Sequence, residues 1–308
     1  MWSGTGTSEG AMYMNRPARL SVGIVSAGRV GSVLGATLAA AGHTVIAASA
    51  VSDASVRRCE ELLPGAEIAR PDEVARRSDL VLLAIPDDVL PGTVRGLVAA
   101  GALRSGQIVV HTSGAHGVDV LDPAAEAGAL CLALHPAMTF TGRSEDVQRL
   151  ASCCIGVTAA ADDEAAWPVG EALAVEMGAE PVRLPEAARP LYHAALTHGA
   201  NHLITLIADC LDQLRGAGVT QPERLVGPLL SASLDNVLRH GDRALTGPVA
   251  RGDSGTVRAH LDVLSQHAPE IVDSYTTLAH RTAVRARETG LLAEDAAADI
   301  DTALGGKQ

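Results

Sequence analysis

The segment from Tyr192 to His202 concentrates side chains that could transfer a proton. It carries the imidazoles of His193 and His198 and the carboxamide of Asn201. A histidine titrates near pH 6.5, which makes it the usual general acid or base at neutral pH. On an α-helix His198, Asn201 and His202 share a face, whereas His193 lies about 140° from His198. We expect His193 or His198 to donate a proton and Asn201 to orient a substrate; packing or capping roles are the alternative.

From the composition we expect no lysine chemistry in a pocket. The only lysine is Lys307, in the terminal sequence GGKQ, and a reactive lysine must be desolvated. Arg251 could bind a substrate carboxylate through two parallel hydrogen bonds, or it could form a structural ion pair with Asp253. The histidines lack H-E-x-x-H or carboxylate-rich spacing, so we expect no metal site.

A second group of residues could bind a dinucleotide. The apolar run 22–25 ends at a small-residue turn, and Gly28 and Gly31 then open a stretch with helical apolar spacing. The fingerprint G-x-G-x-x-G would place a further glycine at Ser26. Serine is small, so the turn survives if the backbone angles of Ser26 are ordinary. A glycine-rich turn that only packs is the alternative.

The end of the second predicted strand indicates which dinucleotide binds. An NAD site usually carries Asp or Glu there to hold the ribose 2′-hydroxyl. Residues 47–50 contain no acid, and Asp53 is better placed to cap the next helix. The groups that could hold a 2′-phosphate are those of Ser49, Ser52, Arg57 and Arg58. We therefore predict NADP; a solvated helix face is the other explanation for the two arginines.

Polar turns also follow the later strands. Ser113 lies three residues after the run GQIVV, and His135 directly follows the run ALCLAL. The carboxyl ends of parallel strands meet at one edge of a sheet, where ligands bind. The residues expected to contact the cofactor are Ser26, Gly28, Arg29, Val30, Gly31, Ser49, Ser52, Arg57, Ile85, Pro86, Ser113 and His135.

The elements that must position these residues fall into two groups. Strand and helix patterns alternate up to residue 184, which predicts an α/β fold with a doubly wound, mostly parallel Rossmann sheet. From Pro185 onward the pattern is helical, over 186–215, 221–241, 253–266 and 268–290. We expect a disordered leader over 1–18, a Rossmann dinucleotide-binding domain over 19–184, and an all-helical substrate and dimerisation domain over 185–308.

The composition indicates which kinds of partner this chain could bind. A net charge of -12 and a pI near 5.3 argue against a nucleic-acid surface, which needs a basic stripe. The apolar runs are interrupted well before the roughly 18 residues of a spanning helix, so we expect no membrane partner. Five cysteines without C-x-x-C spacing indicate a reducing, cytoplasmic compartment. The expected partner is a small-molecule substrate.

Several segments resemble a known group of enzymes. DLVLLAIPDD and LALHPAMTF are similar to the 6-phosphogluconate dehydrogenase-like superfamily, which includes pyrroline-5-carboxylate reductase, ketopantoate reductase and prephenate dehydrogenase. HTSG, RPLYHAALTHGANHL and ALTGPVARGDSGTVRAHL resemble a branch in which a Rossmann-like domain precedes a helical domain of unknown function. The resemblance covers roughly residues 20–290.

The resemblance implies a nicotinamide cofactor in the cleft between the domains and a homodimer formed largely by the helical half. In the superfamily's hydroxyacid dehydrogenases a catalytic lysine precedes an asparagine by three positions, and His198 and Asn201 have that spacing here. We expect an NADP(H)-dependent oxidoreductase that acts on a small carboxylate-bearing oxo, hydroxy or imino acid, such as a ketopantoate-like compound. The alternatives are a dinucleotide-binding regulatory or scaffold protein without turnover, and a nucleotide-binding enzyme without hydride transfer.

Overall fold

The computed structural model describes residues 19–306, and the leader expected over 1–18 lies outside this range. The chain divides into two compact units between His198 and Gly199. The sequence placed this boundary earlier, at 184/185. The start of the long helical region belongs to the first unit because Arg189 is hydrogen-bonded to strands of the sheet.

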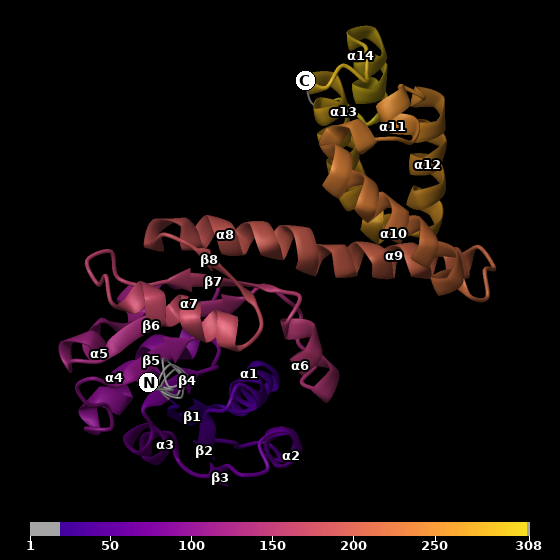
Figure 1. Ribbon diagram of the computed structural model, residues 1–308. Coiled ribbons are helices and arrows are strands. Elements are labelled where there is room, and N and C mark those ends of the chain that lie inside the picture. The colour runs from indigo at the N-terminus through magenta and orange to yellow at the C-terminus, as the bar shows by residue number, and fades with distance from the viewer. Residues whose placement is uncertain (1–18, 307–308) are drawn as a thin grey trace, which may run out of the picture. The chain divides into compact units, whose positions relative to one another are not determined.

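The first unit is built on an eight-stranded sheet with the order β3-β2-β1-β4-β5-β6-β7-β8 (Figure 1). Its strands are β1 (Ser21–Val25), β2 (Thr44–Ala48), β3 (Glu67–Ile68), β4 (Leu80–Leu83), β5 (Ile108–His111), β6 (Leu130–Pro136), β7 (Cys154–Thr158) and β8 (Glu180–Arg183). Neighbouring strands are parallel except β6 and β7. This confirms the predicted doubly wound, mostly parallel Rossmann sheet.

Helices cover both faces of this sheet. Those on one face are α1 (Arg29–Ala40), α2 (Asp53–Leu62), α6 (Ser144–Leu150) and α7 (Ala166–Glu176). Those on the other are α3 (Pro71–Arg77), α4 (Leu90–Ala99) and α5 (Asp122–Glu126), with the short 3-10 turns η1 (Asp87–Val89) and η2 (Val118–Leu121) nearby.

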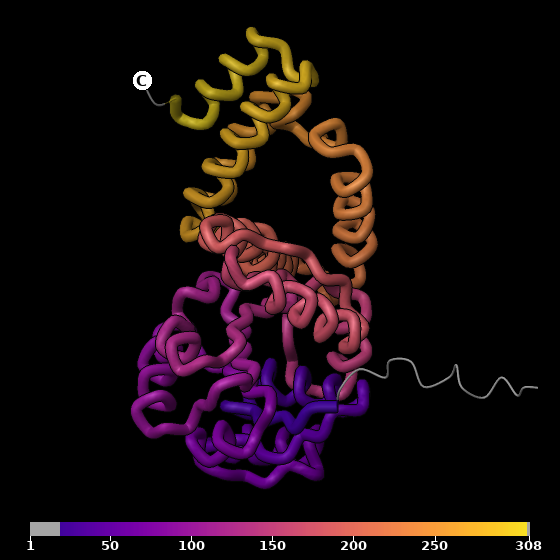
Figure 2. The backbone as a smooth tube through the Cα atoms, turned by 60° about the vertical axis from the view of Figure 1, so that its left-hand side comes forward, coloured from indigo at the N-terminus to yellow at the C-terminus, as the bar shows by residue number. Residues whose placement is uncertain are grey.

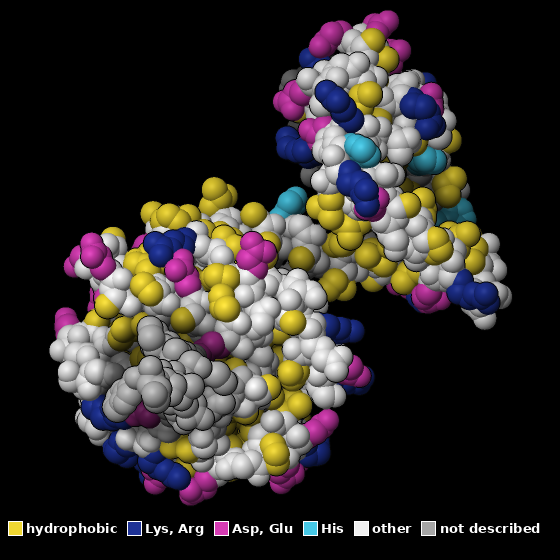
Figure 3. Space-filling view, viewed as in Figure 1, with side chains coloured by type: hydrophobic (Ala, Val, Ile, Leu, Met, Phe, Trp, Pro, Cys, Tyr) yellow, Lys and Arg dark blue, Asp and Glu magenta, His cyan; other side chains and the backbone are white. Residues whose placement is uncertain are grey.

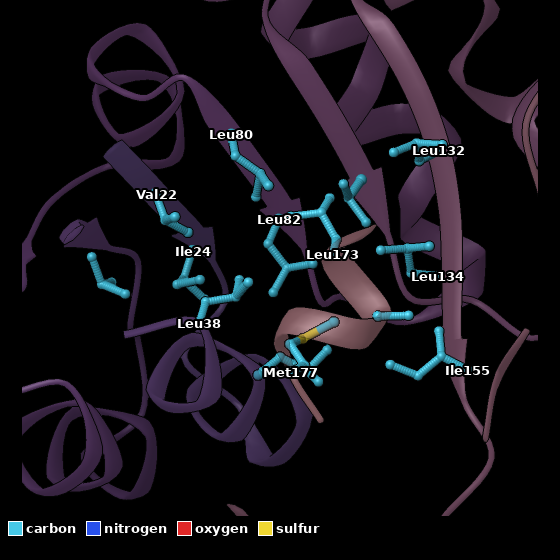
Figure 4. Packing of buried hydrophobic residues seen from close by; sticks show 14 of the residues in the cluster. Val22, Ile24, Leu38, Leu80, Leu82, Leu132, Leu134, Ile155, Leu173 and Met177 are labelled. Atoms are coloured by element: carbon cyan, nitrogen blue, oxygen red, sulfur yellow. The ribbon is translucent and has the colours of Figure 1, made fainter. Parts of the chain in front are cut away.

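Successive strand residues alternate between the two hydrophobic clusters that these helices complete. Leu80 and Leu82 of β4 pack in the first cluster, whereas Val81 and Leu83 pack in the second. Figure 4 shows the first cluster, where side chains of the central strands meet Leu173 of α7. Burial on both faces explains why the sequence of β4 is continuously apolar.

The polypeptide then continues as a series of helices. The 3-10 turn η3 (Glu186–Ala188) and α8 (Arg189–Leu196) precede the π-helical turn η4 (Thr197–Asn201). The later elements are α9 (His202–Gly216), α10 (Pro222–His240), η5 (Gly241–Ala244), α11 (Pro248–Arg251), α12 (Ser254–His267), η6 (Pro269–Ile271), α13 (Val272–Glu288) and α14 (Glu294–Ala303). The second unit has its own core, in which α13 and α14 pack side by side (Figure 2). Helix α14 was not predicted from the sequence, because its alanine-rich segment carries few large apolar residues.

The stretch predicted to be helical over 186–215 is helical in the structure, but it is not one regular α-helix. The π-helical turn Thr197–Asn201 separates α8 from α9, and Gly199 lies within it. A π-helical turn bonds i to i+5 and is found frequently at functional sites. The rotation of 100° per residue therefore does not hold from His198 to Asn201, so the shared face deduced for these residues and His202 loses its geometric basis.

Hydrophobic side chains lie at the surface of α9 and α10 (Figure 3). The exposed ones are Leu203, Ile204, Leu206, Leu225, Leu229, Leu234, Val237 and Leu238. A helix that is apolar on several faces is normally covered by other protein. Within the described part of the chain, no helix is both long and apolar enough to cross a membrane.

Candidate active site

A cavity of about 440 Å³ opens at the carboxyl ends of β1, β4, β5 and β6. It is lined by Ser26, Gly28, Arg29, Val30, Ala84, Ile85, Pro86, Asp87, Thr112, Ser113, Gly114, His135 and His193. The strand order reverses between β1 and β4, and open parallel sheets bind their ligands at such a point. The residues predicted after β4, β5 and β6 therefore meet at one cavity.

A second cavity, of about 340 Å³, adjoins the first at the glycine loop. Both cavities are lined by Ser26 and Gly28. The remaining lining residues of the second are Ser49, Ala50, Val51, Ser52, Ser55 and Arg58. These residues follow β2 or lie on α2, and none of them is a carboxylate. The two cavities together provide space on either side of the amino terminus of α1.

Ser26 adopts a left-handed backbone conformation. Its φ is +77°, and it is the one non-glycine residue with positive φ in residues 19–306. The condition that Ser26 has ordinary backbone angles is therefore not met, and serine here costs about 1–2 kcal/mol relative to a residue without a Cβ. The hydroxyl of Ser49 accepts a hydrogen bond from the amide of Ser26 (2.8 Å), and the carbonyl of Ser49 accepts one from Ala27 (2.7 Å). Ser49 thus holds the loop in this conformation.

The two glycines of the loop serve different purposes. A Cβ on Gly31 would lie 2.2 Å from the carbonyl oxygen of Ser26, so α1 packs this closely on the loop only with glycine. A Cβ on Gly28 would meet only the Ser26 hydroxyl, at 3.4 Å. The space over Gly28 is therefore open, at the start of α1. The first amides of a helix lack intrahelical partners and attract anions, so this is where a phosphate would bind.

Arg58, rather than Arg57, faces the second cavity. Arg57 is exposed and is not among the residues that line the cavity. Arg58 packs on the loop between β6 and α6, where a Cβ on Gly142 would lie 2.9 Å from the Arg58 Nε. The buried carboxylate of Asp146 accepts hydrogen bonds from the amides of Thr141 (2.6 Å) and Gly142 (2.8 Å). This fixed loop supports the guanidinium beside the cavity.

Three aromatic rings gather at the other end of the site. His135 ends β6, and its Nδ1 lies 2.9 Å from the hydroxyl of Tyr192 on α8. The ring of His193 stands edge-on to His135, with centroids 5.9 Å apart. A Cβ on Gly114 would lie 2.6 Å from Cδ2 of His193 and 2.8 Å from Nε2 of His135. The absence of a side chain at Gly114 therefore lets both imidazoles reach the cavity.

His135 is neutral at physiological pH. Burial lowers the pKa of His135 to about 4, and electrostatic interactions with Arg189 and His193 act in the same direction. The imidazole of His135 therefore cannot serve as a cationic proton donor at neutral pH. Of the two histidines that line this cavity, His193 is left as the candidate acid.

Arg189 ties α8 to the sheet. Its guanidinium is fully buried and donates to the carbonyls of Ser113 (2.8 Å), Ala133 (2.7 Å) and Gly156 (3.0 Å) and to the hydroxyl of Thr158 (2.9 Å). Among residues 19–306 no carboxylate forms an ion pair with it. Burial lowers the pKa of Arg189 to about 10, so it stays charged at neutral pH. The first turn of α8 is thereby fixed, and with it Tyr192 and His193.

A buried histidine supports the loop after β5. His111 donates from Nε2 to the carbonyl of Gly117 (2.7 Å), and its Nδ1 accepts from the amide of Ser113 (3.1 Å). Burial lowers the pKa of His111 to about 4. The carboxylate of Glu186 accepts from the amide of Val118 (2.7 Å) and joins the same loop to η3.

We expect this histidine to make stability depend on pH. The unfolded chain protonates His111 near pH 6.5, whereas the folded chain does so only near pH 4. Its contribution is thus complete above pH 6.5 and is lost as the pH falls, by up to about 3 kcal/mol. Urea unfolding at pH 7.5 and pH 4.5 measures the loss. His111→Gln should reduce the difference between the two pH values, and an unchanged difference would contradict the assignment.

The other residues predicted from the sequence lie elsewhere. His198 is exposed in the π-helical turn and does not line the cavity described above. Asn201 and Arg251 belong to the second unit, and Arg251 forms an ion pair with Asp253 at 2.9 Å. Their catalytic roles stay predictions. In residues 19–306 no group of His, Cys, Asp or Glu is arranged to hold a metal ion.

Arg189 was not predicted as a site residue from the sequence, and Tyr192 was given less weight than the histidines. Both lie in the helical stretch that begins after the last strand, and their partners come from strands far away in the sequence. The one available signal for Arg189 was an arginine directly followed by proline at the start of an apolar helix. That pattern is too common to identify a buried guanidinium.

The sequence matches two domain profiles. Residues 6–136 match a Rossmann-like domain, and residues 153–282 match a domain of unknown function, DUF2520. No curated protein sequence matches the chain. The chain therefore joins a Rossmann-like domain to a DUF2520 domain.

Solved structures share the fold at low sequence identity. A protein from Bacteroides fragilis, provisionally named an NADP oxidoreductase, is 19% identical with a TM-score of 0.74, over 86% of this chain and 98% of that one. A reductive aminase from Aspergillus terreus with NADPH and ethyl levulinate is 17% identical (TM-score 0.63, 92% and 99% covered). Pyrroline carboxylate reductase from Plasmodium falciparum with NADP bound is 12% identical (TM-score 0.57, 91% and 98%). Other matching structures hold NAD.

Proposed function

We propose that this chain, a Rossmann-like domain joined to a DUF2520 domain, is an NADP(H)-dependent oxidoreductase. The observation that supports it most is the pair of adjoining cavities on either side of Gly28. One ends at the hydroxyls and guanidinium after β2, and the other ends at the imidazoles of His135 and His193. A dinucleotide has its phosphates in the middle and its two nucleosides at the ends, so it matches this arrangement.

The residues present fit the phosphates of NADP. Gly28 leaves open space at the start of α1, whose first turn contains no acidic side chain to repel an anion. The second cavity offers Ser52 and Arg58 without a competing carboxylate. A guanidinium binds a phosphate through charge-assisted hydrogen bonds, so Arg58 is the residue we assign to the 2′-phosphate.

Arg58→Ala should lower the affinity for NADPH by roughly 10- to 100-fold and leave the affinity for NADH nearly unchanged. The reason is that only NADPH carries the phosphate that the guanidinium would hold. Titration of cofactor fluorescence measures both constants. Arg57→Ala is the matched control and should change neither. An equal loss for NADH, or a larger effect at Arg57, would contradict the assignment.

For the chemical step we propose a reduction of a small carboxylate-bearing oxo or imino acid, or the reverse oxidation of a hydroxy acid. When bound, NADPH supplies the hydride. His193 lines the cavity and is the residue we assign to donate the proton. The side chain of Arg189, which donates to a backbone carbonyl of the sheet, keeps His193 in place. The substrate class rests on the sequence resemblance. Monitoring oxidation of NADPH across oxo and imino acids, ketopantoate-like compounds included, tests it.

A regulatory dinucleotide-binding protein is the second candidate. Ser26 in a left-handed conformation supports it, because this loop departs from the usual glycine at that position. The two candidates share cofactor binding and differ in turnover. Tight NADPH binding without oxidation of NADPH by any compound of the screen would favour the regulatory role.

We also propose that the protein forms a homodimer through the second unit. The support is the row of exposed leucines on α9 and α10, such as Leu229 and Leu238. Sedimentation velocity at micromolar concentration should show a dimer. Leu229→Glu should shift it to a monomer, because a carboxylate buried at an interface is costly. Val175→Glu, at an exposed position of α7, should leave the dimer intact; a wild-type monomer would contradict the proposal.

A further inference from the structure

We infer that Tyr192 holds the imidazole of His135 in the tautomer that carries its proton on Nε2, so that His135 is a fixed, neutral hydrogen-bond donor for a carbonyl oxygen in the active-site cavity. Tyr192 is then a positioning residue, since it acts through His135. The role in binding and turnover rests on the proposed function. The tautomer itself is a property of the protein alone.

The hydroxyl of Tyr192 is the donor of the bond between the two residues. It lies 2.9 Å from Nδ1 of His135, and the rings are nearly perpendicular, with an interplanar angle of 89°. Burial raises the pKa of Tyr192 above its ordinary value, so the phenol keeps its proton at neutral pH. Among residues 19–306 the structure gives this hydroxyl no second hydrogen-bond partner. Donation to Nδ1 therefore satisfies both groups, whereas the reverse direction would leave the phenol proton without an acceptor.

The protonation of Nε2 follows from this bond. A neutral imidazole carries one proton, and an Nδ1 that accepts a hydrogen bond leaves that proton on Nε2. Nε2 lies beside Gly114, where a Cβ would approach it to 2.8 Å, and both residues line the cavity. Because the ring is buried and lies near the positive charge of Arg189, it stays uncharged at neutral pH.

A neutral N–H group is a suitable hydrogen-bond donor for a carbonyl oxygen. It can polarise a carbonyl oxygen without giving up its proton, which separates the role of His135 from that of His193. Two carbonyl groups could accept this bond: the carboxamide of a nicotinamide and the carbonyl of a substrate. The two share the same chemistry, and affinity measurements distinguish them.

Nitrogen NMR of the full-length protein tests the tautomer directly. Long-range proton–nitrogen spectra of ¹⁵N-labelled protein between pH 5.5 and 8 should show His135 with a protonated Nε2, an unprotonated Nδ1 and no titration. In Tyr192→Phe the same ring should show a mixture of both tautomers. A protonated Nδ1 in the wild type, or an unchanged spectrum in Tyr192→Phe, would overturn the inference.

The second unit contains a matched control. The hydroxyl of Tyr275 lies 2.9 Å from Nδ1 of His260, with ring centroids 6.0 Å apart and an angle of 82°. Tyr275→Phe removes the same hydroxyl from the same kind of pair. It should leave the His135 signals unchanged, and a shift of His135 in this variant would mean that Tyr192→Phe also acts through a general disturbance.

Affinity measurements identify the carbonyl. If it belongs to the nicotinamide, Tyr192→Phe should weaken NADP⁺ binding by about 2- to 10-fold and leave 2′-phospho-ADP-ribose, which lacks the nicotinamide, unaffected. If it belongs to the substrate, both ligands should bind normally and kcat/KM should fall. Unchanged affinity together with unchanged kcat/KM would overturn the donor role. Failure of the wild type to bind either ligand would refute the proposed function while the NMR result still stands.

Discussion

His193→Ala should lower kcat by about 10²- to 10⁴-fold on a substrate identified by the NADPH oxidation screen. General acid catalysis contributes a factor of that size, and alanine removes the imidazole that lines the cavity at the end where we place the nicotinamide. The affinity for NADPH should remain nearly unchanged, because the phosphates would bind at Gly28 and Arg58. Steady-state kinetics and cofactor titration on the same preparation measure both quantities.

His198→Ala is the matched control for this experiment. His198 lies five positions later in the chain, in the π-helical turn, and does not line the cavity of the first unit. The His198→Ala variant should therefore retain most of the wild-type kcat. Full activity in His193→Ala combined with a large loss in His198→Ala would reverse the assignment. Full activity in both variants would exclude His193 and His198 as the proton donor.

Arg189→Met should destabilise the protein by at least about 3 kcal/mol. The variant leaves the buried carbonyls of Ser113, Ala133 and Gly156 without their donor, and each unsatisfied buried polar group costs about 1–3 kcal/mol. Urea unfolding at pH 7.5 measures the loss. The folded fraction should also bind substrate and cofactor less well, because Tyr192 and His193 follow Arg189 on the same helix.

The same substitution at Arg183 provides the comparison. Arg183 is an exposed arginine that pairs with Glu171 at 2.5 Å. An exposed ion pair contributes about 0–1 kcal/mol, so Arg183→Met should unfold at nearly the wild-type urea concentration. A similarly small effect of Arg189→Met would show that the buried guanidinium does not fix α8.

Local patterns in the sequence were sufficient to predict the sheet and the edge at which its cavity opens. Alternating strands and helices predict a doubly wound sheet because a parallel strand needs a crossover to reach its neighbour. The strand ends at Ile85, Ser113 and His135 then had to lie at one edge, and all three line one cavity. Helical periodicity gave the later helices, but it failed at the π-helical turn, since one extra residue per turn leaves no clear mark in a sequence.

Tertiary contacts decide which of several similar residues takes part in the candidate site. Arg57 and Arg58 are adjacent and chemically equal, and the packing of Arg58 on the Gly142 loop distinguishes them. The left-handed conformation of Ser26 is unusual for serine, and the hydroxyl of Ser49 on the neighbouring strand end supports it. Neither contact follows from the local sequence, because each joins segments that only the folded sheet brings together.

The sequence alone thus determined the fold of the first unit, the position of its glycine-containing loop and the placement of the only lysine at Lys307. These depend on residue type and on spacing within one element. Only the tertiary structure placed Tyr192 on His135 and Arg189 on the strand ends, across 57 and up to 76 positions of sequence. A buried hydrogen bond is specified by the geometry of both partners, and that geometry exists only when the helix has packed on the sheet.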